Sequence, residues 1–159
     1  MKMSDNEILD YLWDETLGKI ARNTVMHYMG HRLGTYDINA LRDDDFEQIA
    51  LLHRTALYAG TTLSNGRFRL RINKLVKQGK LLTKLNKDNR TFIINADVKP
   101  VVISAITFWQ QAGLPFGYTD QTKTCKKTIP AESVKIFEMS TACYQLLRHN
   151  YPTYRIRER

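Results

Sequence analysis

Apolar residues recur at helical spacing near the start of this chain. Residues 8, 9, 12 and 13 are apolar, and they follow Ser4-Asp5-Asn6-Glu7, which has the form of a capping box. In such a box the serine hydroxyl and the glutamate carboxylate each accept a bond from the other residue's amide. The pattern predicts a helix over residues 5–16, which could continue past Gly18, and a second helix from about residue 20 to Gly30 or Gly34.

The middle of the chain predicts two further helices. Asp43-Asp44-Asp45 indicates a helix start, because carboxylates offset the positive end of the helix dipole. Spaced apolar residues continue this helix to about residue 59, and Gly60 is a suitable stop. Ser64 is a good N-cap for the next helix, residues 65–78, and Gly79 is its expected terminator.

The second half of the chain predicts a hairpin and two more helices. Residues 81–85 and 91–95 are expected to be short strands, joined by a polar turn over residues 86–90. Pro100 precedes a strongly apolar helix that ends near residue 112, and a last helix is expected over about residues 131–149. The predicted fold is therefore mainly α with a small β-hairpin, in a single domain of residues 1–159.

Positive charge is concentrated in one block of this sequence. Residues 61–90 hold nine basic side chains and a single acid, Asp88, which gives +8, the formal net charge of all 159 residues. The first sixty residues are net acidic. Charge focused on one surface raises the local concentration of a polyanion and speeds its capture. Nucleic acid is therefore the leading candidate partner.

The helix expected at residues 65–78 has an apolar side and a basic side. On a helical wheel, Phe68, Ile72, Leu75 and Val76 cluster together, and we expect them to anchor the helix in a core. Four residues are expected to line the opposite side, and four others lie on the flanks. The opposite side consists of Arg67, Arg71, Lys74 and Gln78, and the flanks consist of Arg69, Leu70, Asn73 and Lys77.

The order helix, short turn, basic helix and hairpin resembles the winged-helix variant of the helix-turn-helix across residues 44–95. In this resemblance residues 44–59 correspond to the support helix, residues 65–78 to the recognition helix and residues 81–95 to the wing. The fold it implies is a winged helix-turn-helix core flanked by extra N- and C-terminal helices. The chain departs from the family in one respect, because the family's support helix is usually short.

The resemblance implies that the recognition helix enters the major groove of double-stranded DNA while the wing contacts phosphates or the minor groove. Arginine offers a planar fork that suits guanine edges and phosphates, and lysine acts more as a point charge. The expected DNA-binding residues are Ser64, Asn65, Arg67, Arg69, Arg71, Lys74, Lys77, Lys80, Lys87 and Arg90.

Other candidate chemistry in the sequence is weaker. His27 and His31 have a spacing that can hold zinc, but no further ligand lies nearby at a recognised spacing. Cys125 lies among lysines that could lower its pKa, although an ordinary loop thiol is the simpler interpretation, and Cys143 is expected in the core. No phosphate loop, nucleophile elbow or convergent catalytic set is visible. We therefore expect no enzyme activity, cofactor or metal.

The C-terminal region, residues 100–150, contains a helix that is apolar nearly all round and must be buried on several sides. We predict that it builds a homodimer interface with the last helix; the alternative is that both pack against the N-terminal helices of the same monomer. No stretch is long and apolar enough to span a bilayer, and the N-terminus turns acidic where a signal peptide would become apolar. A cytoplasmic, nucleoid-associated protein is expected.

Together these patterns predict a sequence-specific double-stranded DNA-binding protein, a small transcription regulator of a prokaryote, phage or plasmid. Two alternatives remain open. The same basic face could bind RNA, or the chain could be a protein-interaction module, such as an inhibitor or adaptor, that docks an acidic partner.

Overall fold

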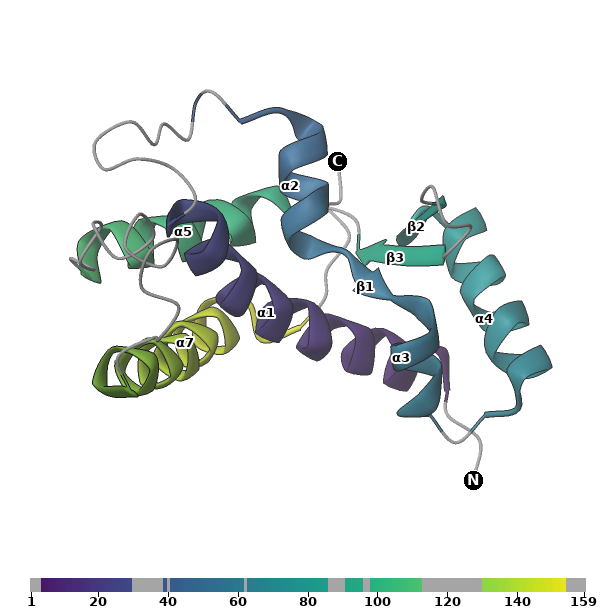
Figure 1. The fold of residues 1–159 in the computed structure, drawn as a ribbon. Coiled ribbons are helices and arrows are strands. Elements are labelled where there is room, and N and C mark those ends of the chain that lie inside the picture. Colours follow the sequence, from purple (N-terminus) through teal and green to yellow (C-terminus); the bar gives the residue numbers. More distant parts are fainter. Residues whose placement is uncertain are drawn as a thin grey trace.

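The computed structural model describes residues 4–29, 39, 41–61, 63–85, 91–95, 98–112 and 130–153. These residues form a mostly helical fold with a small three-stranded antiparallel sheet (Figure 1). The elements in chain order are α1 (Asp5–Met29), α2 (Asp43–Ala50), β1 (Leu52–His53), α3 (Arg54–Ala59), α4 (Asn65–Lys77), β2 (Leu81–Leu85), β3 (Thr91–Asn95), α5 (Lys99–Ala112) and α7 (Pro130–Asn150).

Helix α1 is one continuous helix where the sequence predicted two. The capping box at its start is confirmed: the Ser4 amide donates to Glu7 Oε1 at 3.0 Å, and the Glu7 amide donates to Ser4 Oγ at 3.1 Å. Gly18 does not interrupt the helix, although a mid-helix glycine costs about 1 kcal/mol relative to alanine. Buried residues on both sides of Gly18, among them Leu17 and Ile20, hold the helix against its neighbours.

The prediction of a single helix over residues 43–59 is wrong, because residues 51–53 are extended and separate α2 from α3. Leu51 adopts φ −73° and ψ 145°, and Leu52 and His53 then pair with β3 before α3 begins at Arg54. Leu52 is buried opposite Ile93, so pairing with β3 and burial outweigh the local preference for helix. This strand gives the sheet the order β1–β3–β2.

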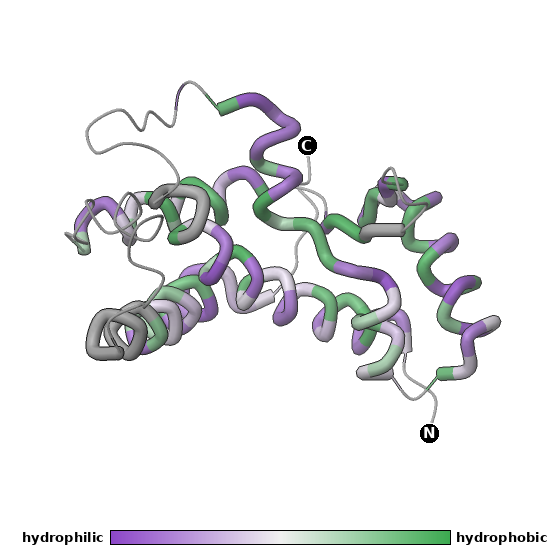
Figure 2. Tube along the Cα trace, viewed as in Figure 1, coloured by the Kyte–Doolittle hydropathy of each residue, from purple (hydrophilic) through white to green (hydrophobic). Residues whose placement is uncertain are grey.

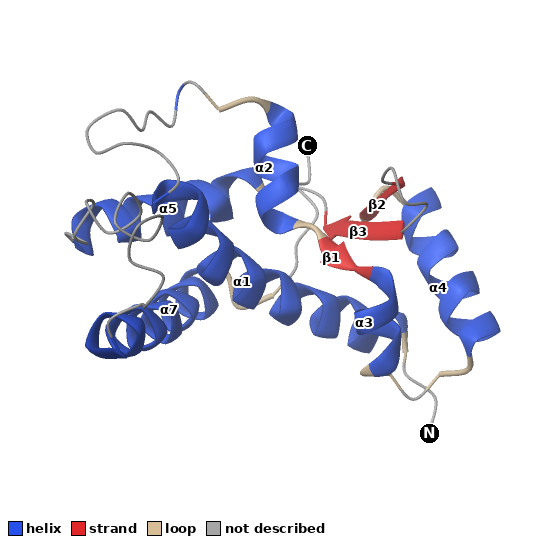
Figure 3. Cartoon of the chain, viewed as in Figure 1, coloured by secondary structure: helices blue, strands red, loops and turns tan. Residues whose placement is uncertain are grey.

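The two strands of the predicted hairpin are confirmed at their predicted bounds, with Leu81 opposite Asn95 and Leu85 opposite Thr91. The turn between them, residues 86–90, lies outside the described residues. Figure 3 shows the three strands in the middle of the fold with helices on both sides.

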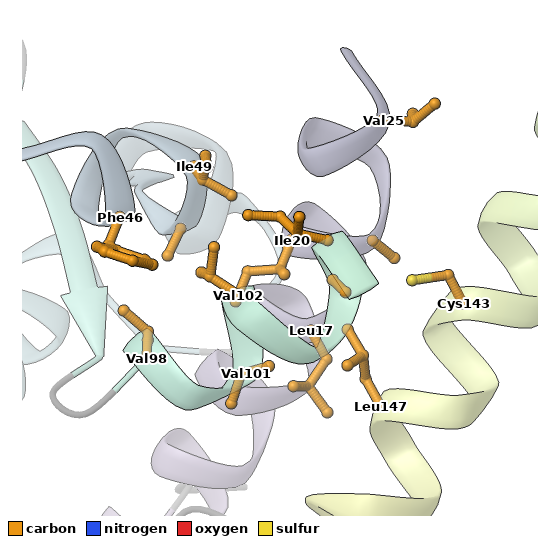
Figure 4. Close-up of a cluster of buried hydrophobic side chains, with 14 of the residues drawn as sticks. Leu17, Ile20, Val25, Phe46, Ile49, Val98, Val101, Val102, Cys143 and Leu147 are labelled. Carbon is orange, nitrogen blue, oxygen red and sulfur yellow. The ribbon is translucent and has the colours of Figure 1, made fainter. Parts of the chain in front are cut away.

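Two hydrophobic clusters share the sheet. Neighbouring residues of a strand point to opposite faces, and in β3 Ile93 belongs to one cluster while Ile94 belongs to the other. The Ile94 cluster joins the later part of α1 to α2, α5 and α7, and Figure 4 shows Leu17, Val101 and Leu147 meeting within it. The Ile93 cluster joins the first turns of α1 to β1, α3, α4 and β2. Helix α1 therefore takes part in both (Figure 1).

The C-terminal helices pack against α1 within the monomer, which is the alternative that the sequence left open. Trp109 of α5 is fully buried and its indole Nε1 donates to Ala21 O at 3.2 Å. Cys143 and Leu147 of α7 are buried in the same cluster, and the Tyr144 hydroxyl bonds Asp14 of α1. The homodimer stays a prediction, and the buried face of α5 is already covered by its own chain.

The end of α3 depends on a close approach that only glycine permits. The Tyr11 hydroxyl donates to Leu57 O at 3.0 Å, and a Cβ at Gly60 would overlap that hydroxyl and lie 3.0 Å from the ring carbon that bears it. A Cβ at Gly66, in the first turn of α4, would meet nothing within 4 Å.

We expect Gly60→Ala to lower the free energy of unfolding by about 1–3 kcal/mol, because the added methyl overpacks against Tyr11. Gly66→Ala is the matched control and should be neutral or stabilising by up to about 1 kcal/mol, because alanine is the better helix former. Urea unfolding of both variants measures the difference. Equal stability of the two variants would contradict the packing of Tyr11 on this turn.

Candidate nucleic-acid interface

Helix α4 is fixed at both ends and along one side. Ser64 Oγ accepts a bond from the Arg67 amide at 3.3 Å, as an N-cap does, and Gly79 has the positive φ of 76° that lets the chain turn into β2. Phe68, Ile72 and Leu75 are buried in the Ile93 cluster. The predicted helix, its cap and its terminator are confirmed, and the rest of its surface is left for other contacts.

The outward face of α4 is rotated from the one predicted. Residues 66, 70, 73 and 77 lie opposite the buried stripe, and the Leu70 side chain is 69% exposed. Arg71 instead lies at the edge of the core and is only partly exposed. The predicted opposite side was misplaced, because a spacing of about 100° per residue puts Arg71 on the flank of the stripe even when Val76 is counted in it. Val76 itself is half-buried and packs at the edge of the stripe.

Arg71 and Lys74 are held by an acid near the N-terminus, Asp5. The Arg71 guanidinium pairs with one carboxylate oxygen of Asp5, and Lys74 Nζ lies 2.8 Å from the other oxygen. These bonds, that of Lys74 first and that of Arg71 second, hold the pKa of the Asp5 carboxyl below its ordinary value. Sequence reasoning missed Asp5 in this role, because no local pattern signals a contact between residues 66 positions apart.

The acidic start of α2 engages two other lysines. Lys84 of β2 pairs with Glu47 and lies 3.4 Å from Asp44 Oδ1, and the Glu47 bond is the first cause of the raised pKa of Lys84. Lys99 lies 3.8 Å from Asp43 Oδ1. The helix start predicted at these aspartates is confirmed, and Asp45 accepts a bond from the Arg42 amide at 2.8 Å. Lys84 therefore belongs to the α2 side of the hairpin and not to the face of α4.

We call the exposed residues of α4 and its N-cap the α4 face. No acid occurs in residues 63–85, and Figure 2 shows hydrophilic and hydrophobic positions alternating along α4. Of the other expected DNA-binding residues, Lys80 is half-buried. Lys87 and Arg90, in the hairpin turn, lie outside the described residues. The α4 face consists of Ser64, Asn65, Gly66, Arg67, Arg69, Leu70, Asn73, Lys74 and Lys77.

Other candidate chemistry finds no support in the described part of the chain. No group of three or more histidine, cysteine or acidic side chains there could hold a metal ion. None of its helices is long and apolar enough to cross a membrane. Burial raises the pKa of the Cys143 thiol to about 12, so that thiol stays protonated. Cys125 and His31 lie outside the described residues.

We expect Asp5→Asn to lower the free energy of unfolding near neutral pH by at most about 1 kcal/mol, because both partners remain partly exposed. A carboxyl whose pKa is lowered by folding stabilises the fold above its unfolded pKa and loses that effect as pH falls through the folded pKa. The difference in the free energy of unfolding between wild type and variant should therefore disappear in acid, as the pH falls below 3.8, the ordinary pKa of an aspartate carboxyl. Chemical unfolding across this pH range measures it, and a gap that stays constant would contradict the ion pair.

Cys143 should resist thiol reagents in the folded protein. In a Cys125→Ser background we expect almost no reaction with dithiobis-nitrobenzoate at about pH 8, because the thiol is buried and protonated. Addition of denaturant should expose it to full reaction, which serves as the control. Rapid labelling of the native protein would place Cys143 outside the core.

Comparisons with known proteins complete the description of this site. A scan against models of protein families finds none that matches the sequence. A search of curated proteins finds no significant match either.

Proposed function

We propose that this protein binds double-stranded DNA by placing α4 in the major groove, in the manner of a winged-helix domain. The observation that carries the proposal is the α4 face. It is exposed, rich in arginine, lysine and asparagine, and free of acids along residues 63–85. An α-helix is about 10–12 Å across with its side chains, and the major groove is about 12 Å wide.

The order of the elements supports this proposal. Helix α3 has six residues and is followed by a turn and by α4, so the long support helix expected from the sequence is replaced by a short one. A short helix before the basic helix agrees with the winged-helix pattern and supports the proposal. Strand β1 also pairs with β3, which ties the hairpin to α3 and α4 through the sheet. The hairpin corresponds to the wing in this proposal.

The side chains of the α4 face suit direct contact with base edges. Arg69 offers two parallel donors for guanine O6 and N7, and the Asn73 amide can pair with adenine N6 and N7. Leu70, which is apolar and exposed, suits the methyl group of thymine. Arg67, Lys74 and Lys77 lie where they would neutralise phosphates, which fix the register of a helix on the duplex.

We propose further that the bound DNA is a regulatory site, and that the protein is a small transcription regulator of a prokaryote, phage or plasmid. Regulators that bind two-fold sites are often dimers, so a homodimer is part of this proposal. Duplex RNA is a weaker candidate, because its major groove is too deep and narrow for side chains to reach.

Exposed leucines favour one alternative function, the docking of an acidic protein. Leu82 and Leu85 of β2 are exposed, as is Leu70 of α4. Exposed apolar residues within a basic surface would suit an acidic amphipathic partner. Absence of nucleic-acid binding at physiological salt would favour this function.

Fluorescence anisotropy with a mixed-sequence DNA duplex and a matched RNA duplex tests the proposal. We expect wild type to bind DNA more tightly than RNA and to weaken steeply with salt. Arg69/Lys77→Ala should reduce the DNA affinity at least about tenfold at low salt and reduce the slope of log K against log salt by about 2.

Lys19/Arg22→Ala is the matched control, because it removes the same charge from α1, in the part of that helix beyond Gly18. This control should change the DNA affinity much less than Arg69/Lys77→Ala does. Equal losses in the two variants, or no binding to either duplex, would refute the placement of α4 in the groove.

A further inference from the structure

Asp5 holds two cations of α4: Lys74, which belongs to the α4 face, and Arg71, which lies beside it. Its carboxylate has two oxygens, and each engages one cation: the first pairs with the Arg71 guanidinium, and the second lies 2.8 Å from Lys74 Nζ. Because one negative charge meets two positive charges, the cluster keeps a single net positive charge. Asp5 therefore reduces the positive potential at the rim of α4 without removing it.

The cluster is open to an approaching phosphate. The side chain of Asp5 is 26% exposed and that of Lys74 is 55% exposed, so solvent reaches both partners. Lys74 lies beside the outward stripe of α4, next to Leu70 and Asn73. Any duplex that contacts this stripe would bring its phosphates near Lys74 and the neighbouring Arg71.

A DNA phosphate can replace the Asp5 carboxylate at Arg71 and Lys74 at a small cost in free energy. Exposed ion pairs generally change an equilibrium by less than about fivefold, so the bonds of Asp5 do not prevent displacement. A phosphate offers the same charge-assisted bonds to arginine and lysine as a carboxylate does. The two anions therefore compete for the same donors.

We propose that Asp5 is an internal counter-ion that competes with DNA phosphates for Arg71 and Lys74, and that it thereby limits the sequence-independent part of DNA affinity. This inference rests on the proposed function. Phosphate contacts carry no sequence information, so Asp5 lowers the affinity for all duplexes alike. Discrimination between sequences stays with the base-facing residues Arg69, Leu70 and Asn73.

Asp5→Asn tests this role directly, with Asp10→Asn as the matched control. Asp10 lies on the same helix and is exposed, so both variants remove one negative charge from α1. We expect Asp5→Asn to bind a mixed-sequence duplex about two- to fivefold more tightly at low salt. The salt dependence should steepen by about 1 in slope, because the net charge of the cluster rises from +1 to +2. Asp10→Asn should change the affinity by less than about twofold.

A double-mutant cycle separates competition from a general charge effect. In an Arg71→Ala/Lys74→Ala background, Asp5→Asn should change neither affinity nor slope, because the donors for which the anions compete are gone. Persistence of the gain in that background would overturn the proposal. So would weaker binding by Asp5→Asn when circular dichroism shows an intact fold, because that result assigns Asp5 to the positioning of α4.

The outcomes distinguish this inference from the proposed function. If wild type binds DNA and loses affinity in Arg69/Lys77→Ala, while Asp5→Asn behaves like Asp10→Asn, then only the counter-ion role fails. If neither wild type nor Asp5→Asn binds a duplex at low salt, both proposals fail.

Discussion

The fold depends on β3, the central strand of the sheet, and on its attachment to α1. Ile93 and Ile94 point to opposite faces, so this strand belongs to both hydrophobic clusters. At its end the buried Asn95 donates from Nδ2 to Thr16 Oγ1 at 2.6 Å and to Leu12 O at 3.3 Å. A buried amide with such partners is costly to displace, because its polar groups would lose their bonds without reaching water. The strand therefore fixes both clusters to one helix.

A strongly basic helix such as α4 needs support from the rest of the fold to stay on the surface. Like charges three and four positions apart weaken an isolated helix, so α4 needs stabilisation from elsewhere. The Ser64 cap, the buried stripe of Phe68, Ile72 and Leu75, and the Asp5 ion pairs provide it. These stabilising contacts do not involve Arg69, Asn73 or Lys77, so the side chains of these three residues can serve contacts with a partner.

Local signals predicted those elements whose boundaries are set locally. Ser64 and Gly79 marked both ends of α4, and the two strands of the hairpin were found at their observed bounds. The break at Leu51 was missed, because pairing with β3 decides it. The continuity through Gly18 was left open, because packing of α1 against α5 and α7 decides it. For the site, the helix and its buried stripe could be predicted, but the outward side was misplaced on the wheel. The acid that pairs with Arg71 and Lys74 could not be predicted, because Asp5 is distant in the sequence.

The sharing of α1 by both clusters has a consequence for dissecting the protein. Residues 44–95 look like a self-contained unit in the sequence, yet Ile8, Leu9 and Leu12 of α1 complete the apolar cluster beneath α4. Excised from the chain, that unit would turn the buried sides of Phe68 and Leu75 toward water and would lose the partners of Asn95. The smallest fragment that folds on its own must therefore retain the N-terminal helix α1. Residues 44–95 alone would not fold into a stable DNA-binding domain.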